Sequence, residues 1–172
     1  MADLPKTIKV DPFDQSSIDA AIQYLTKFRK NLEKVPRRVV DKSVKAGESI
    51  AKLNVADYSA IDTGWLMNSI HASVRRGGKS AAVIADAPHA AYVEYGTGYR
   101  GQNSPHPEPG SYPSGWVYDV NEHGVAGWIY KGDDGKLHFT QGFESRPYMY
   151  DTARMLRKEI PRLAREELDK IL

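Results

Sequence analysis

Apolar residues at helical spacing dominate the first third of the chain. After Ser16 or Ser17, either of which can cap a helix, apolar side chains recur at three- and four-residue steps. This stripe consists of Ile18, Ala21, Ile22, Leu25, Phe28, Leu32 and Val35. Pro36 suits a first helical turn but not a helix interior, so a second helix is predicted from about Pro36 to Leu53. We expect this helix to bury Val39, Val40, Val44, Ile50 and Leu53.

The pattern changes from helical to β-compatible at about residue 70. Residues 70–76 and 80–85 flank Gly77-Gly78, and a two-glycine turn between such runs is typical of a β-hairpin. Three further segments, residues 115–118, 127–130 and 137–140, alternate aromatic and polar positions and are predicted to be strands.

The segment between the hairpin and these strands, residues 96–115, is rich in Gly, Pro, Ser and Asn. It is too polar to pack against a core and too long for a simple turn. It is therefore predicted to be a projecting loop.

Helical spacing returns at the end of the chain. Pro147 suits a first turn, and the stripe that follows consists of Met149, Ala153, Leu156, Ile160, Leu163, Leu168 and Ile171. Pro161 falls inside this stripe and should kink or split the helix. The order predicts an α+β fold: an N-terminal helical arm, a small antiparallel sheet, and a long C-terminal amphipathic helix packed on the sheet.

A length of 172 residues is enough for one domain with a hydrophobic core. We expect an N-terminal extension over residues 1–15 and a single domain over residues 16–172. Within that domain the helical arm covers residues 16–56, the sheet region with its loop covers 57–145, and the C-terminal helix covers 146–172.

The composition excludes several classes of protein. Lys and Arg number 24 against 22 acidic residues, which argues against a strongly basic nucleic-acid coat protein and an acidic disordered tail. The absence of Cys excludes a disulfide scaffold, a thiolate zinc site and a Cys nucleophile. Since neither a signal-peptide pattern nor a run of about eighteen apolar residues is found, we expect a soluble intracellular protein with no membrane partner.

Basic residues are concentrated in the helical arm, where nine lie between Lys27 and Lys52 against three acidic residues. Two interpretations remain open. The run is either a solvated helix face, as most charge runs are, or a surface that faces an acidic partner or DNA.

Asp62-Thr63-Gly64 is the triplet found in the active sites of aspartic proteases, where two such loops bring paired carboxylates together. Here it precedes Trp65-Leu66-Met67, which has the pattern of a short helical turn, and Asp62 or Thr63 acting as an N-cap explains it. The protease is kept only as a remote alternative.

The run from Gly96 to Gly101 matches the glycine spacing of a dinucleotide-binding loop, which requires a helix directly after it. Pro105, Pro107 and Pro109 forbid that helix, so the cofactor interpretation is rejected. The five histidines are scattered without the spacing of a zinc site, and no Gly-x-Ser-x-Gly element is present. We therefore predict no enzyme, no cofactor and no metal site.

Aromatic residues crowd the second half of the chain, between Tyr92 and Tyr150. They could stack on nucleic-acid bases, but few basic residues accompany them, namely Arg100, Lys131, Lys136 and Arg146. A core or a protein–protein interface is the favoured interpretation.

Three segments in this order resemble a known family. Residues 61–70 resemble an apolar-Asp-Thr-Gly-x-Leu-x-x-Ser-Ile element, residues 90–98 a Tyr-x-Glu-aromatic-Gly-Thr-Gly run, and residues 145–149 a closing Arg-Pro-aromatic-Met element. The chain is similar to the tail-completion, or neck, proteins of long-tailed bacteriophages, also labelled tail components of the HK97 type.

This resemblance implies a structural protein without catalysis at the head–tail connection of the virion, in the neck or tail, assembled in the cytoplasm of the host bacterium. It implies a homo-oligomeric ring, expected to be a hexamer, that contacts tail-terminator or tail-tube proteins on one side and head-closure or connector proteins on the other. The Asp-Thr-Gly and Gly-x-Gly matches then have architectural roles. A nucleic-acid-binding module is the main alternative.

Two sets of candidate site residues follow. The candidate subunit-interface set is Glu94, Tyr95, Gly96, Thr97, Gly98, Arg146 and Pro147, with Glu94 and Arg146 as charge partners at the base of the loop. The candidate DNA-channel set is Arg75, Arg76 and Lys79, at the tip of the predicted hairpin, where non-specific contact with DNA is possible.

Overall fold

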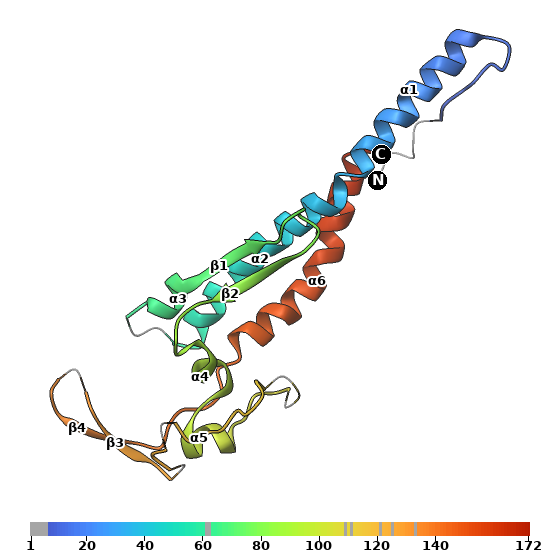
Figure 1. Cartoon of the computed structure of the whole chain (residues 1–172). Helices are drawn as coiled ribbons and strands as arrows, with labels where there is room; N and C mark the ends of the chain where they lie inside the picture. The colour runs from blue at the N-terminus through green and yellow to red at the C-terminus, as the bar shows by residue number, and fades with distance from the viewer. Residues whose placement is uncertain are drawn as a thin grey trace. The chain divides into compact units, whose positions relative to one another are not determined.

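The computed structural model describes residues 7–60, 63–108, 110, 112–120, 122–124, 126–132 and 134–172. It contains helices and two small antiparallel sheets of two strands each, which confirms the predicted α+β class (Figure 1). The chain divides into two compact units. Unit 1 consists of Met1–Ala46, Ala72–Ala82 and Met155–Leu172, and unit 2 of Gly47–His71 and Val83–Arg154. The prediction of a single domain stays a prediction.

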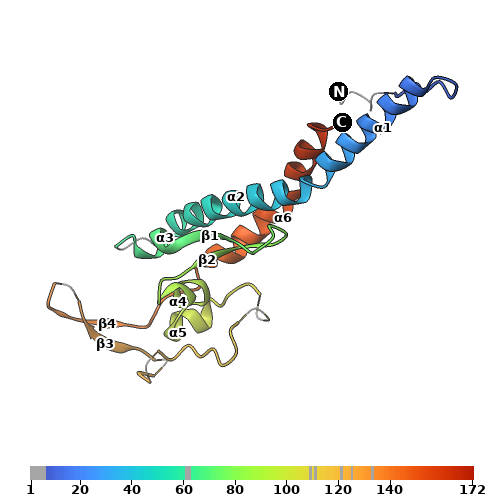
Figure 2. The same ribbon diagram turned by 45° about the horizontal axis from the view of Figure 1, so that its top comes forward.

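The first helix, α1, spans Gln15–Leu32 (Figure 2). Its N-cap is Asp14, whose carboxylate accepts the Ser16 amide N–H at 3.0 Å, so the prediction of Ser16 or Ser17 as the cap was wrong by a few positions. An ionised carboxylate suits this position because it also faces the positive end of the helix dipole. Ala21 is buried, whereas much of the predicted apolar stripe is exposed, including Ile22, Leu25 and Leu32.

The second helix, α2, spans Val35–Asp57, so Pro36 lies in its first turn as predicted. Val44 is buried in unit 1. In unit 2 the helix buries Ala51 and Val55 completely, whereas Leu53 is 63% exposed. The prediction that Leu53 is buried was therefore wrong, because the buried face passes through the residues two positions to either side of it.

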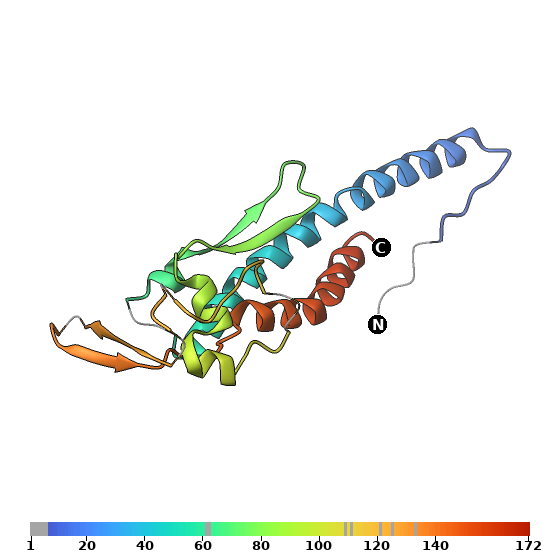
Figure 3. The same ribbon diagram turned by 60° about the horizontal axis from the view of Figure 1, so that its bottom comes forward.

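A short helix and a hairpin follow. Helix α3 covers Trp65–Ser69 and has Gly64 as its N-cap, with φ 77°, instead of the predicted Asp62 or Thr63. The Thr63 hydroxyl still accepts the Trp65 amide N–H at 3.3 Å, and Asp62 lies outside the described residues. Strands β1, Ile70–Val74, and β2, Ala81–Ala85, form the predicted hairpin (Figure 3).

The described residues of the segment from Gly96 to Gly115 include a helix and buried side chains. Helix α4 spans Ala90–Tyr95, and α5 spans Gly98–Asn103. The helix α5 lies mostly within the glycine run and ends at Asn103, and residues 104–108 after it are not helical, as the prolines predict. His106, near the middle of the segment, is only 2% exposed, so the prediction of a loop that does not pack was wrong.

Strands β3, Trp128–Lys131, and β4, Leu137–Thr140, pair in antiparallel register with Trp128 opposite Thr140 and Lys131 opposite Leu137. They confirm two of the three predicted aromatic strands. Residues 115–118 are not a strand. The Trp116 ring packs against Tyr92 and Tyr95 of α4, and no strand partner pairs with residues 115–118 among the described residues.

The last helix, α6, spans Tyr148–Asp169 and begins directly after Pro147. It continues as one element through Pro161, which shows that the predicted split does not occur. In unit 2 the buried Asn54 amide of α2 donates to the Tyr148 carbonyl oxygen at 3.1 Å and to the Thr152 hydroxyl at 3.0 Å. These bonds hold the first turn of α6 against α2.

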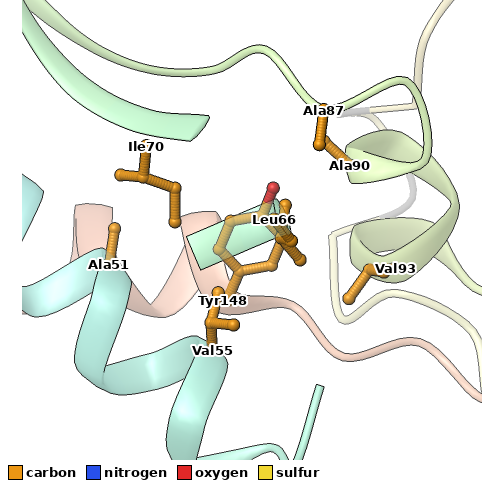
Figure 4. Packing of buried hydrophobic residues seen from close by; sticks show 8 residues of the cluster. All are labelled: Ala51, Val55, Leu66, Ile70, Ala87, Ala90, Val93 and Tyr148. Carbon is orange, nitrogen blue, oxygen red and sulfur yellow. The ribbon is translucent and has the colours of Figure 1, made fainter. Parts of the chain in front are cut away.

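The core of unit 2 brings together five elements that are far apart in sequence (Figure 4). It consists of Ala51, Val55, Leu66, Ile70, Ala87, Ala90, Val93 and Tyr148. Tyr148 at the start of α6 is 1% exposed, as is Ile70 at the start of β1, and Val83 and Ala85 of β2 pack against the same cluster. The prediction that the C-terminal helix packs on the sheet is confirmed here.

Unit 1 contains a buried carboxylate, Glu167 of α6, whose side chain is 3% exposed. The ammonium groups of Lys42 and Lys170 bond to it, Lys42 at 2.6 Å, and the Arg38 guanidinium lies 3.8 Å away. These hydrogen bonds from lysines lower the pKa of Glu167 to about 2.

Candidate assembly site around Glu94

Helix α4 ends in a glycine turn that allows a second segment to approach closely. Gly96 adopts φ 79°, and a Cβ there would lie 2.7 Å from the Ser145 amide nitrogen. At Gly98, with φ 61°, a Cβ would lie 2.5 Å from the Gln141 carbonyl oxygen. Glycine is required at both positions, because a side chain would meet backbone atoms and a positive φ strains other residues. The Gly-Thr-Gly run is therefore architectural.

Thr97, between these glycines, forms an isolated antiparallel β-bridge with Phe143, in the segment that leads into α6. Its amide donates to the Phe143 carbonyl oxygen at 2.9 Å, and its hydroxyl accepts the Phe143 amide N–H at 3.4 Å. The amides of Gly98, Arg100 and Gly101 donate to other carbonyl oxygens of the chain. Since these donors are already used, the loop does not present the free amides that a phosphate-binding loop needs.

Glu94 is the centre of this region and is 6% exposed. Its two carboxylate oxygens accept the amide N–H groups of Met149 and Tyr150, each at 2.9 Å. These are amides of the first turn of α6, which have no partner inside the helix. Glu94 therefore caps a helix that begins more than fifty positions later in the sequence.

The imidazole of His106 is the third partner of Glu94, with Nε2 3.2 Å from Oε1. Removal of the carboxyl from water raises the pKa of Glu94, while the two amides and His106 act in the opposite direction. The ring is held from its other side by the backbone of Glu108, whose carbonyl oxygen lies 3.2 Å from Nδ1. Sequence reasoning missed His106 because it stands between prolines in a polar segment.

Aromatic rings surround the Glu94–His106 pair. The Tyr95 ring lies 5.0 Å from both His106 and Tyr112 and 5.2 Å from Trp116, measured between centroids. The Tyr112 hydroxyl accepts the His106 amide N–H at 2.9 Å. The polar segment thus folds over Glu94 through its tyrosine and tryptophan rings, which are half-buried, and the choice between a core and an interface for them stays a prediction.

Tyr118 belongs to the same group of aromatic side chains. Its hydroxyl lies 2.8 Å from that of Tyr112, and burial together with this hydrogen bond raises the pKa of Tyr118 to about 12. Because the Tyr118 phenol stays protonated at neutral pH, it adds no charge near Glu94.

Arg146 does not pair with Glu94, so the predicted charge pair at the loop base was wrong. Its backbone amide donates to the Val93 carbonyl oxygen at 2.9 Å. Its guanidinium donates to the Ser59 carbonyl oxygen at 3.3 Å and lies 5.9 Å from the centre of the Phe143 ring. Glu94 points instead into the buried interior, where a guanidinium on the surface side does not reach it.

Arg146 lines a groove of about 450 Å³ on the surface of unit 2. The walls are mostly apolar and include Trp65, Leu66, Val93 and Phe143, with His89 against the Trp65 ring at 5.7 Å. Its lining includes Thr63 and Gly64 as well as Phe143 and Arg146. It combines apolar walls with one cationic side chain.

The predicted interface set lies mostly inside unit 2. Thr97 is 2% exposed, and Gly96, Gly98 and Pro147 are buried, whereas Tyr95 and Arg146 are half-buried. Their role between subunits stays a prediction, since every contact described above is within one chain. The signal that could have located this site is Glu94 itself, a carboxylate inside the otherwise apolar run of residues 90–95.

The predicted DNA-channel set lies in unit 1. Arg75, Arg76 and Lys79 are exposed at the turn of the β1–β2 hairpin, where the Arg75 amide donates to the Ser80 carbonyl oxygen at 2.9 Å. A Cβ at Gly78 would lie 2.9 Å from Cγ of Arg37, so the stem of a further basic side chain adjoins this turn.

Some cations of the helical arm are paired with acids. Arg29 bonds to Glu33, Lys45 to Asp41 and Lys52 to Glu48, as expected on a solvated helix face.

Within the described parts of the chain, no group of three or more His, Cys, Asp or Glu could hold a metal ion. Nor does a helix among these residues have both the length and the apolarity needed to cross a membrane.

Residues 19–96 match the model of the family described as "Bacteriophage HK97-gp10, putative tail-component". The match confirms the family resemblance inferred from the sequence over this segment, which begins within α1 and ends at Gly96, two residues after Glu94. No curated protein and no solved structure matches the chain. The closing Arg146-Pro147 element lies beyond the matched residues.

Proposed function

We propose that the protein is a structural component of a bacteriophage virion that joins the tail to the DNA-filled head. The observation that carries this proposal is the family match over residues 19–96, which includes the Asp-Thr-Gly element and the Glu94 run. A tail component of this family is expected to act by binding other virion proteins and not by catalysis.

The proposed assembly is a homo-oligomeric ring, a hexamer matching the sixfold tail, placed in the neck between tail-terminator and head-closure proteins. A ring requires two different patches on each subunit that bind each other. Exposed apolar side chains are available on both units: Ile22, Leu25 and Leu32 on α1, and Leu137 and Phe139 on β4. Surfaces of this kind support a protein that functions in an assembly.

The test is electron microscopy of lysates from a phage that carries a stop codon in this gene. We expect full heads beside separate, complete tails, and intact particles when the gene is supplied from a plasmid. Normal tailed particles without the plasmid would contradict a joining role. Heads with aberrant or missing tails would place the function earlier, in tail assembly.

A second proposal is that Arg75, Arg76 and Lys79 face DNA in the channel of the ring. It is supported by their exposure at one turn, next to Arg37. Each phosphate contact should add to the salt dependence of DNA binding. Replacing all three by Ala should weaken binding of a short DNA duplex, measured by fluorescence anisotropy at low salt. The charge-matched control replaces Lys27, Lys30 and Lys34 by Ala together. Equal loss of binding in both variants would argue against a specific role for the turn.

A further inference from the structure

Phe13 lies just before α1, and its side chain is 97% exposed. This is the highest exposure among the large apolar side chains of the described residues. Asp11 and Asp14 flank it, so the chain presents one aromatic ring between two carboxylates.

The turn that carries Phe13 is fixed by hydrogen bonds. The Phe13 amide donates to the Asp11 carboxylate at 2.9 Å, and the Asp14 amide donates to the Asp11 carbonyl oxygen at 3.2 Å. The Asp11 amide in turn donates to the Ser17 hydroxyl of α1 at 2.9 Å. Because the backbone is ordered in advance, binding through Phe13 loses little conformational entropy.

The groove of unit 2 has complementary features. Its volume, about 450 Å³, lies in the range of sites that enclose small ligands and exceeds what one phenyl ring needs. Trp65, itself 57% exposed, and Phe143 offer aromatic walls for edge-to-face or offset contact with an inserted ring.

Charge complementarity favours the same pairing. The Arg146 guanidinium has five N–H donors, and its described hydrogen bond to the Ser59 carbonyl oxygen uses one of its nitrogens. Arg pairs well with carboxylates because its donors match both oxygens. Asp11 and Asp14 each lie within two positions of Phe13, so an inserted ring would bring a carboxylate to the Arg146 side of the groove.

We propose that Phe13 of one copy inserts into the groove at Trp65 and Arg146 of a second copy. The turn and the groove are different surfaces, so the contact is heterologous and repeats around a closed ring. This proposal rests on the proposed ring assembly and identifies the residues of one of its contacts.

Disulfide trapping tests the contact, because the natural chain contains no Cys. Thr63 lines the groove and is exposed, so a variant with Phe13→Cys and Thr63→Cys should form a ladder of covalent multimers on non-reducing gels. The control pair Phe13→Cys and Leu137→Cys, with Leu137 75% exposed, should give no ladder. Equal ladders from both pairs would mean random collision and overturn the proposal.

A disulfide within the monomer would overturn it as well, because Phe13 would then occupy the groove of its own chain. Mixing the two single variants, Phe13→Cys and Thr63→Cys, must give a dimer and nothing larger.

In sedimentation experiments, Phe13→Ala should weaken association about tenfold or more, as expected for an aromatic hot spot. Phe139→Ala, which removes another exposed phenyl ring, is the matched control and should cost much less.

The two proposals can fail separately. If the ladder forms but the purified protein does not join heads to tails, the contact stands and the joining function is wrong. If the protein joins heads to tails and no ladder forms, the ring contact is elsewhere and this inference is wrong.

Discussion

Each of the two compact units contains a buried glutamate at α6: Glu94 accepts amides of its first turn, and Glu167 is part of the helix itself. The two carboxylates differ in almost every other respect. Glu94 in unit 2 is 6% exposed and is held by amide N–H groups and an imidazole that is itself buried. Glu167 in unit 1 is 2% exposed and is held by lysines whose side chains are 40% and 54% exposed. Glu94 has a raised pKa and Glu167 has a lowered one.

Exposure alone does not determine the direction of these shifts, since the less exposed carboxylate has the lower pKa. What differs is the partner. Half-exposed lysines bring full positive charges to Glu167, whereas Glu94 receives mostly dipoles and loses its water. Glu167 thus takes part in an ordinary ion-pair network. Glu94 instead connects α4, the segment around His106 and α6 through specific hydrogen bonds.

The largest effect is expected for Glu94→Ala. This change leaves two amides of α6 and the His106 imidazole without their acceptor, so the free energy of unfolding should fall by about 3–5 kcal/mol, as when one partner of a buried pair is removed. Denaturant unfolding followed by tryptophan fluorescence measures it. Glu94→Gln keeps the shape and one acceptor oxygen and should lose only about 1–2 kcal/mol. Equal losses in the two variants would show that the second carboxylate oxygen and its charge, which Gln lacks, account for the whole effect.

Gly96→Ala should be the next most damaging change. Both Gly96 and Gly115 have a positive φ, 79° and 78°, but a Cβ at Gly96 meets backbone while one at Gly115 has nothing within 4 Å. Thermal unfolding of Gly96→Ala and Gly115→Ala therefore separates steric contact from strain. The excess loss at Gly96 should be about 1–3 kcal/mol, as for overpacked sites. Equal melting temperatures would mean that the close approach at Gly96 relaxes without cost.

The third prediction concerns pH and sets the two glutamates against each other. Because the folded pKa of Glu167 is about 2, below the usual 4.5, its stabilisation is complete above pH 4.5 and is lost as the pH falls toward 2. Glu94 has the opposite sign, since a raised pKa means that its ionisation opposes folding and that acid removes this cost.

Unfolding free energies of the wild type and Glu167→Gln, measured from pH 7 to pH 2, test this directly. The difference between the two proteins should be constant down to about pH 4.5 and should disappear near pH 2. A difference that persists at pH 2 would show that the lysines do not determine the behaviour of Glu167.

The smallest effect is expected on the β3–β4 hairpin. Leu137 is 75% exposed, so Leu137→Ser should change the free energy of unfolding of the isolated chain by no more than about 0.5 kcal/mol, as for other surface changes. Denaturant titration checks this value. A larger loss would mean that this apolar side chain is already covered within the chain.

The sequence predicted the parts of the fold that depend on local pattern. Periodicity located α1, α2 and α6, and Gly77-Gly78 located the β1–β2 turn, because spacing and turn chemistry act over a few residues. Some predictions were wrong by about two positions: Ser16 was predicted as the cap where Asp14 is observed, and Leu53 was predicted to be buried where Ala51 and Val55 are. Such errors arise because a periodic pattern does not define the exact ends of a helix or the exact edges of its buried face.

The site around Glu94 was not predictable in the same way. Sequence reasoning selected Glu94 and the Gly-Thr-Gly run from a family resemblance, but it gave Glu94 the wrong partner and treated the segment with His106 as a projecting loop. The contacts of His106 with Glu94 and Tyr112 join positions that no periodic pattern relates, and they depend on tertiary packing. A carboxylate in an apolar run signals that a partner exists without identifying it.

The central claim, that this protein joins heads to tails as a structural component, is tested most directly by complementation in vitro. Extract from cells infected with the stop-codon phage, containing separate heads and tails, is mixed with the purified protein and plaques are counted. We predict that wild-type protein restores infectious particles in proportion to the amount added and that Glu94→Ala does not. A titre that stays at background with folded wild-type protein would contradict the claim.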